Sequence, residues 1–227
     1  MSVTGDFGSA SPGLDLSANQ NGSMIGAVVT LMVIATLSVS LRAFLRIIST
    51  EVDLALDDYL IFIALLCCYG LGTCVLISLS YGNGHHIETL TDHDFTVLWK
   101  LLFAHVILYA AGVTCTKTSI MMFYRRIFKL YWSLWPVMFL ILGYFTVIIV
   151  TIAVACRPLP YFWEQYTHPD TAKGTCIDTA TFFLGNGIAA VLIDVIILCV
   201  PIPITWKLQM PKSQRMAVIG ILLLGSL

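Results

Sequence analysis

The stretch Tyr81–Phe95 gathers side chains that could do chemistry. It holds three of the five histidines and three of the thirteen acidic residues within fifteen positions. Imidazoles are ligands for zinc and copper, so His85, His86 and His93 could hold a metal ion. Neighbouring histidines point in different directions unless the backbone is extended, and no cysteine joins them. We therefore assign no metal site, and metal binding stays as the alternative to a polar loop.

The same stretch also carries the signals of a tight turn followed by a helix. Gly82 and Gly84 permit the positive φ angles that such a turn uses. Thr91, with Asp94 three residues later, has the pattern of a capping box and predicts a helix that begins near Thr91. The acids are then explained without chemistry. An external pH-sensing role for the imidazoles of His85, His86 and His93 stays open.

Two charges lie inside apolar runs, where an ion is costly and is usually paired, hydrated or functional. Lys117 precedes Tyr124 by seven residues, which places it about 10 Å from the end of its run. Asp194 precedes Ile204 by ten residues, or about 15 Å. These similar depths predict a Lys117–Asp194 contact, direct or through water. The alternative is that the lysine extends to the membrane surface while the aspartate is protonated or bound to backbone.

A second set of charges flanks the first connection between apolar runs. Arg42 and Arg46 are one helical turn apart, and Asp57 and Asp58 open the next run. Aspartate is a favoured N-cap, so we expect one acid to cap that helix while the other reaches the arginines. Paired aspartates can also bind a divalent cation or share a proton. The two neighbouring arginines favour the structural role.

The seven cysteines fall into two groups. Five lie within apolar runs as small packing residues, namely Cys67, Cys68, Cys74, Cys115 and Cys199. Cys156 and Cys176 instead flank one loop, and a disulfide between them would close roughly 20 residues and contribute about 3 kcal/mol. The aromatic content of this loop makes it a candidate lid, with Tyr161, Phe162, Trp163 and Tyr166.

Membrane-spanning helices must position all these side chains. The sequence is 58% hydrophobic and 11% charged, which is more apolar than a soluble domain of this length. A bilayer core about 30 Å thick needs roughly 20 apolar residues in a helix. We predict an all-α polytopic transmembrane bundle over residues 24–227. Its expected spans are about 24–45, 59–80, 101–124, 135–155 and 181–204, and a sixth at 216–227 is too short to cross unless it continues in a longer parent protein.

Loop charges predict the orientation, because lysine and arginine accumulate on the cytoplasmic side. Residues 1–23 contain neither, and their polar composition predicts a disordered external tail without a cleaved signal peptide. Asn21 opens a glycosylation sequon in that tail, although its closeness to the first helix counts against its use. We expect the amino terminus, the histidine stretch and the cysteine loop outside. The predicted cytoplasmic set is Arg46, Arg125, Arg126, Lys129, Lys207, Lys212 and Arg215, against Lys100, Arg157 and Lys173 outside.

The overall charge balance bears on partners. The formal net charge is -1, which is too near zero to indicate a nucleic-acid partner. The basic residues cluster at helix ends, as membrane topology alone requires. We therefore expect a lipid bilayer around the chain and no nucleic acid.

An ordered series of motifs runs from the first helix to the end of the chain. It comprises Arg42-x3-Arg46, Asp57-Asp58-Tyr59, Tyr81–Ile87, Thr116–Ile120, Phe123–Phe128, Cys156-Arg157-Pro158, Phe162-Trp163, Gly174-x-Cys176, Asp194, Pro201-Ile202-Pro203 and Trp206–Gln209. Together these motifs resemble the fungal rhodopsin-domain family of integral membrane proteins, which includes Pth11-like and SAT4-like proteins.

The resemblance implies a seven-helix bundle with an external amino terminus. Pth11-like members are regarded as G-protein-coupled-receptor-like sensors of surface or chemical cues, so we expect a sensor in the plasma membrane, or alternatively an endomembrane. It would bind a small-molecule or surface ligand and a G protein. Arg125 and Arg126 are the candidate G-protein contact by position, and the positive-inside rule is their alternative explanation.

The resemblance implies neither retinal nor another cofactor. We expect no enzymatic activity either, because no nucleophile, base and oxyanion donor share a loop. The alternative function is a transporter or an accessory protein of a biosynthetic pathway with no signalling role. In a transporter, His105, Lys117 and Asp194 would line a proton or substrate path.

Overall fold

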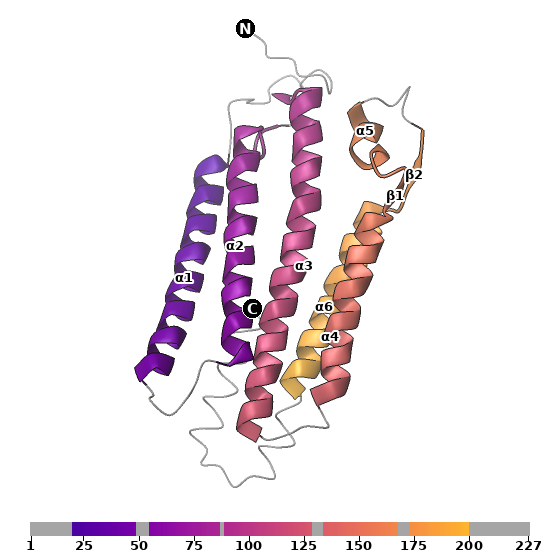
Figure 1. Cartoon of the computed structure of the whole chain (residues 1–227). Coiled ribbons are helices and arrows are strands. Elements are labelled where there is room, and N and C mark those ends of the chain that lie inside the picture. The colour runs from indigo at the N-terminus through magenta and orange to yellow at the C-terminus, as the bar shows by residue number, and fades with distance from the viewer. Residues whose placement is uncertain (1–19, 49–54, 87–88, 129–133, 168–172, 200–227) are drawn as a thin grey trace.

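The computed structural model describes residues 20–48, 55–86, 89–128, 134–167 and 173–199 (Figure 1). The predicted sixth span at 216–227 and the two motifs between residues 201 and 209 lie outside this part. Five of the described helices are long and apolar enough to cross a membrane, which confirms the predicted all-α transmembrane bundle. They are α1 (Asn21–Ile48), α2 (Leu56–Ser80), α3 (Asp92–Phe128), α4 (Leu134–Ala153) and α6 (Thr179–Cys199).

The helices pack in an order that puts α3 at the centre. α2 lies along one side of α3 and carries α1 on its far side, while α4 lies along the other side of α3 and also contacts α6 (Figure 1). Small residues let the α2 and α3 backbones approach closely. A Cβ atom added to Gly112 would lie 3.2 Å from the Cβ of Cys67, and one added to Gly70 would lie 3.1 Å from Leu108 Cδ1.

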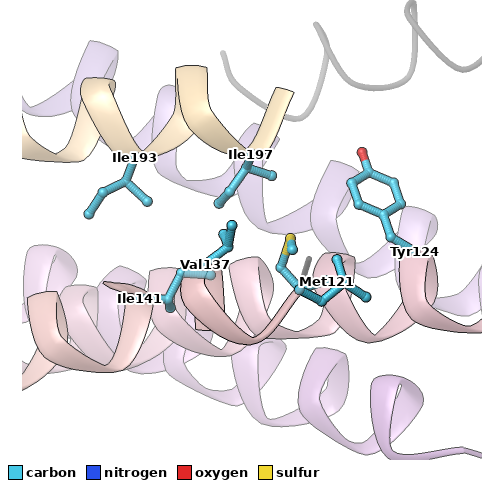
Figure 2. Packing of buried hydrophobic residues seen from close by; sticks show 7 residues of the cluster. Met121, Tyr124, Val137, Ile141, Ile193 and Ile197 are labelled. Carbon is cyan, nitrogen blue, oxygen red and sulfur yellow. The ribbon is translucent and has the colours of Figure 1, made fainter. Parts of the chain in front are cut away.

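The largest buried apolar cluster lies between α3, α4 and α6 (Figure 2). Its members are Met121, Tyr124, Leu134, Val137, Ile141, Ile193 and Ile197. Many other large apolar side chains are exposed, and no residue of the fully described α1 is buried. Phe139 on α4 is 79% exposed and Leu184 on α6 is 68% exposed. Such residues match a hydrocarbon environment rather than water.

The bundle has two distinct ends. We call the one that holds Asn21 and the turn after α2 the hairpin end, because β1 (Cys156–Arg157) and β2 (Thr175–Cys176) pair there antiparallel, with Cys156 opposite Cys176. The short helix α5 (Tyr161–Thr167) connects these strands and packs against α3. We call the opposite end, which holds Arg46 and the start of α2, the arginine end.

Helix starts differ from the sequence prediction at α1 and α6, and also at α2, as described with the site below. α1 begins at Asn21 rather than near residue 24, so residues 21–23 form its first turn instead of the end of a tail. Its start is fixed by the backbone N–H of Gln20, which donates to the carbonyl of Gly84 at 3.3 Å. α6 begins at Thr179, because the carboxylate of Asp178 accepts the backbone N–H groups of Ala180 and Thr181, both at 3.2 Å.

The start of α3 shows how local sequence sets a helix boundary. α3 begins at Asp92, directly after Thr91. The Thr91 hydroxyl oxygen accepts the backbone N–H of Asp94 at 3.2 Å and donates to the Asp94 carboxylate at 2.6 Å. The cap fixes where the long central helix enters the bundle, and hence the height of every side chain along it.

Candidate functional site

The structure brings together the two charges that the sequence places inside apolar runs. Lys117 Nζ on α3 lies 2.9 Å from Asp194 Oδ1 on α6. The lysine side chain is 8% exposed and the aspartate side chain 32%. Lys117 also donates to the backbone carbonyl of Ala190 at 3.3 Å, one turn before Asp194. A charge-assisted contact of this kind is among the stronger hydrogen bonds in proteins.

Two further residues, which the sequence analysis missed, extend this polar contact to α4. The ammonium of Lys117 lies 5.9 Å from the centre of the Tyr144 ring, a cation–π geometry. The Tyr144 hydroxyl donates to Asn186 Oδ1 at 2.8 Å. Asn186 and Asp194 are eight residues apart, two helical turns on the same face of α6. That spacing was the available signal, because Asn186 is a lone amide inside an otherwise apolar run.

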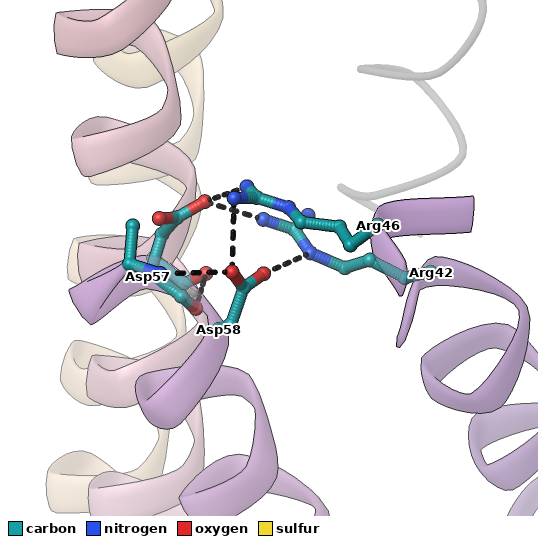
Figure 3. Close-up of polar contacts among 6 residues, drawn as sticks. Arg42, Arg46, Asp57 and Asp58 are labelled. Carbon is teal, nitrogen blue, oxygen red and sulfur yellow. Dashed lines mark hydrogen bonds and ion pairs between the residues drawn. The ribbon is translucent and has the colours of Figure 1, made fainter. Parts of the chain in front are cut away.

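At the arginine end, four charges form a closed clasp between α1 and α2 (Figure 3). Arg42 lies 2.8 Å from Asp57 and 3.3 Å from Asp58. Arg46 contacts Asp57 as well, and lies 2.9 Å from Asp58. Both aspartates are almost fully buried, with 3% and 4% exposed. Each carboxylate therefore meets both guanidinium groups, which offsets the cost of burying it.

The clasp differs from the prediction in how the second helix begins. Neither aspartate is the N-cap, because α2 begins at Leu56 and both acids lie in its first turn. The Asp58 carboxylate reaches back and accepts the backbone N–H of Ala55 at 3.2 Å while it pairs with the arginines. One acid thus supports the helix start and also binds Arg42 and Arg46, where the sequence suggested two separate tasks.

The clasp also reaches α3. The Ser119 hydroxyl donates to the backbone carbonyl of Asp57 at 2.7 Å, and Ser119 is 1% exposed. Arg42 lies 5.4 Å from the centre of the Phe123 ring, one turn further along α3. The arginine end therefore joins α1, α2 and α3 as one unit. Arg125 and Arg126 are exposed in the last described turn of α3 at this same end.

The histidine stretch at the hairpin end forms a turn, not a ligand cluster. Gly82 and Gly84 have φ angles of 84° and 89°. His85 Nε2 lies 3.3 Å from the Asn21 amide nitrogen, which donates when that ring nitrogen is unprotonated. His93 is 78% exposed and points to Asp94 at 3.7 Å. Among the described residues, no three His, Cys, Asp or Glu side chains gather as metal ligands.

The contact with His85 also bears on the sequon. Asn21 Nδ2 is the atom to which a glycan would be attached, and it is turned toward the His85 ring. Asn21 itself is only partly exposed and lies in the first turn of α1. A Cβ atom on Gly84 would lie 2.9 Å from Asn21 Oδ1, so the turn fits tightly against this side chain. These contacts count against glycosylation at this position.

The candidate lid is tied to the bundle by a disulfide and by aromatic packing. Cys156 and Cys176 are bonded across β1 and β2. Phe162 on α5 is 4% exposed and packs edge-on against Trp99 of α3, with ring centres 5.0 Å apart. Lys100, next to Trp99, lies 5.4 Å from the centre of the Trp163 ring. The lid therefore rests on the first turns of α3 rather than above open space.

A pocket of about 260 Å³ lies between α2 and α3 near the hairpin end. His105 of α3 lines it, together with Cys74 and Ser78 of α2. His105 thus lies on the side of α3 that faces α2, whereas Lys117 faces α6. Within the described chain, these two residues do not line one continuous path.

Comparisons with known proteins agree with a membrane helix bundle. The family model of the fungal rhodopsin domain matches residues 41–227. A SAT4 family membrane protein of Emericella nidulans is 29% identical over 151 residues, which cover 64% of this chain and 38% of the relative. A protein of Metarhizium anisopliae named polyenoic acids biosynthesis gene cluster protein Ba17b is 26% identical over 202 residues, or 84% of this chain and 53% of the relative.

The chain thus spans about half or less of the length of these relatives. No solved structure matches it. The family match covers most of the chain, including the clasp, the Lys117–Asp194 contact and both bonded cysteines. The protein is a multi-pass membrane protein and belongs to the fungal rhodopsin-domain family.

Proposed function

We propose that the protein is the membrane core of a G-protein-coupled-receptor-like sensor of an external cue, as expected of Pth11-like members. The observation that carries this proposal is the Lys117–Asp194 contact between α3 and α6. A single polar contact inside a membrane bundle has two discrete states, made and broken. A ligand that binds one helix arrangement better than the other shifts the balance between them.

The two charged sites differ in a way that assigns them different roles. The clasp at the arginine end links two arginines to two nearly buried aspartates and is fastened to α3 through Ser119. Several bonds must break together before α1, α2 and α3 can separate there. Among the described residues, the polar contacts between α6 and α3 come from one lysine, and its aspartate partner is one-third exposed. We infer that α6 is the moving helix and that the first three helices are its fixed frame.

The hairpin end faces outward in this proposal and the arginine end faces the cytoplasm. Two features support this orientation. Lysine and arginine favour the cytoplasmic side, and Arg46, Arg125 and Arg126 lie at the arginine end. Disulfides persist in oxidising compartments, and the Cys156–Cys176 bond lies at the hairpin end. A plasma-membrane location is part of the same proposal, because a sensor of external cues must reach the cell exterior.

Nucleotide exchange on a G protein tests the proposal directly. The protein in lipid nanodiscs is mixed with purified heterotrimeric G protein, and uptake of labelled GTPγS is followed. We expect faster uptake with the wild-type protein and a changed basal rate with Asp194→Asn, which weakens the contact to Lys117. The double variant Arg125→Ala/Arg126→Ala should lose the acceleration, whereas Lys100→Ala at the other end is the matched control. If neither the wild-type protein nor any variant changes the rate of GTPγS uptake, the receptor role is rejected.

An accessory role in a biosynthetic pathway is the second candidate, since one relative is named for a polyenoic acid biosynthesis cluster. In that case the protein has no signalling function. A transporter is supported less, because His105 and Lys117 face different neighbouring helices. Deletion of the gene separates the candidates: loss of one secreted product without any change in G-protein-dependent responses favours the accessory role.

A further inference from the structure

The pocket between α2 and α3 has a closed floor and an apolar wall. Deeper in the bundle the two helices touch, at Gly70 against Leu108 and at Gly112 against Cys67. Toward the hairpin end the helices leave a space of about 260 Å³, whereas about 10–15 Å³ suffices for one water molecule. The α3 wall contributes three leucines, Leu98, Leu101 and Leu102.

Polar groups lie at the two ends of this pocket. His105 and Cys74 lie near the floor, because the α2–α3 contacts of Gly70 with Leu108 place these positions at similar heights. Ser78 and Asn83 lie toward the mouth, where the Asn83 amide donates to the Ser78 hydroxyl at 2.7 Å. Leu98 and His105 are seven residues apart, so the pocket is about 10 Å long at 1.5 Å per residue.

His105 is the residue that points to a ligand. Its side chain is partly buried, and within the described part of the chain no hydrogen bond, ion pair or ring contact is formed by it. A neutral imidazole carries one N–H donor and one acceptor nitrogen, and leaving either of them unpaired among apolar side chains is costly. An oxygen atom of a bound molecule would meet that need.

We propose that this pocket binds an elongated amphipathic small molecule, whose apolar body lies along the leucines of α3 and whose oxygen-bearing head group hydrogen-bonds to His105. The shape follows from the pocket, which is polar at its floor, apolar along about 10 Å and polar again at its mouth. The inference deepens the proposed function and rests on it only in assigning this molecule the role of the cue.

The pocket is linked mechanically to the α3–α6 contact through α3. His105 and Lys117 lie on the same helix, twelve residues or about 18 Å apart. A ligand wedged between α2 and α3 presses on α3 from the side opposite to α4 and α6. Because packed helices move as rigid units, a small displacement of α3 at the pocket reaches the Lys117 ammonium.

Cys74 provides a natural reporter, because its thiol lines the pocket. In the test variant the other free cysteines are replaced by serine and the Cys156–Cys176 bond is kept. The protein in nanodiscs is treated with a small membrane-permeant thiol reagent in the presence of 1-decanol, decanoic acid or decane. At a probe concentration about ten times its dissociation constant, labelling of Cys74 should slow about tenfold. A matched variant that keeps only Cys68, which is on α2 but outside the pocket lining, should show no protection.

The variants at His105 decide the role of the head group. In the His105→Leu variant, we expect Cys74 to be labelled at the rate measured with His105 present and no probe added. Decanol and decanoic acid should no longer slow this labelling, whereas in His105→Gln they should still slow it in part. Protection by only one of the two probes identifies a hydroxyl or a carboxyl head. Equal protection by decane, or protection that survives in His105→Leu, overturns the assignment. So does a Cys74 thiol that is unreactive without any probe while Cys68 reacts, because the pocket is then filled by protein.

The outcome is separable from that of the receptor proposal. Protection of Cys74 without any effect of the protein on nucleotide exchange leaves the binding site in place and removes the signalling role. Accelerated exchange without protection of Cys74 keeps the signalling role and removes the binding site.

Discussion

Lys117 and Asp194 meet across the α3–α6 interface with unequal burial, since the lysine side chain is 8% exposed and the aspartate 32%. The lysine is therefore the partner that most needs its counter-charge, because an unpaired buried ion is strongly destabilising. The carbonyl of Ala190 and the ring of Tyr144 compensate it only in part. The buried charge on α3 therefore depends on the aspartate of α6 for its stabilisation.

Mutations at this contact should reveal the unequal dependence. Asp194→Leu leaves Lys117 unpaired, and we expect a loss of up to about 3–5 kcal/mol, the range for breaking a buried ion pair. Lys117→Met leaves only the more exposed aspartate unpaired and should cost less. The double variant should recover most of the loss. Thermal unfolding in nanodiscs measures all three, and a double variant no more stable than Asp194→Leu would contradict the pairing.

The clasp at the arginine end gives a second prediction. Arg46 has a side chain that is 13% exposed, against 32% for Arg42. The more buried guanidinium contacts both carboxylates with less screening by water, so its removal costs the two buried aspartates more, and Arg46→Met should destabilise the protein more than Arg42→Met. Arg126→Met, which removes an exposed charge at the same end, is the matched control and should stay within about 0.5 kcal/mol. Melting temperatures of the three variants provide the comparison, and equal losses in all three variants would show that the clasp is not needed for stability.

The sequence indicates long-range contacts where polar residues are rare. A lysine and an aspartate inside apolar runs have few possible polar partners, so their similar depths predict a Lys117–Asp194 contact. The same reasoning overlooked Tyr144, because tyrosine is common in apolar runs and its ring carries no charge. It also could not find Ser119, whose partner is the backbone carbonyl of Asp57. A backbone acceptor leaves no trace in the residue types.

Helix starts were harder to predict than helices. Hydropathy locates a span but not the first helical residue, since that depends on which side chain satisfies the free N–H groups. At α6 the cap is Asp178, which precedes the apolar run. At α2 the carboxylate of Asp58 accepts the backbone N–H of Ala55, three residues earlier, so this aspartate lies within the helix and is not its N-cap. At α1 the start depends on Gly84, a residue distant in sequence.

The cap of α6 predicts a pH dependence. Hydrogen bonds from the Thr181 hydroxyl, and then from the backbone N–H groups of Thr181 and Ala180, hold the pKa of Asp178 below its ordinary value of 3.8. A lowered pKa in the folded state means that this carboxylate stabilises the fold above the ordinary pKa. The contribution is lost as the pH falls through the lowered pKa. Asp178→Asn keeps a capping oxygen that does not titrate, so its melting temperature should approach or pass that of the wild-type protein only at acidic pH. A difference that is the same at pH 3 and pH 7 would contradict this.

The disulfide predicts both stability and topology. The two cysteines are 20 residues apart, and a cross-link closing a loop of that size contributes about 3 kcal/mol. We expect reduction to lower the melting temperature of the wild-type protein but not that of Cys156→Ser/Cys176→Ser. In intact cells, a membrane-impermeant thiol reagent should label these positions only after reduction, in the wild-type protein and not in the double variant.

Each result of that labelling bears on a different step of the proposal. Labelling after reduction alone places the hairpin end, and with it the mouth of the α2–α3 pocket, on the outside, where an external cue can enter. Labelling without reduction removes the covalent tie of the lid, so that only the packing of Phe162 on Trp99 holds α5 against α3. Labelling only after the membrane is permeabilised means that the orientation is the reverse of the proposed one. The exposed arginines at the end of α3 then face away from any cytoplasmic G protein.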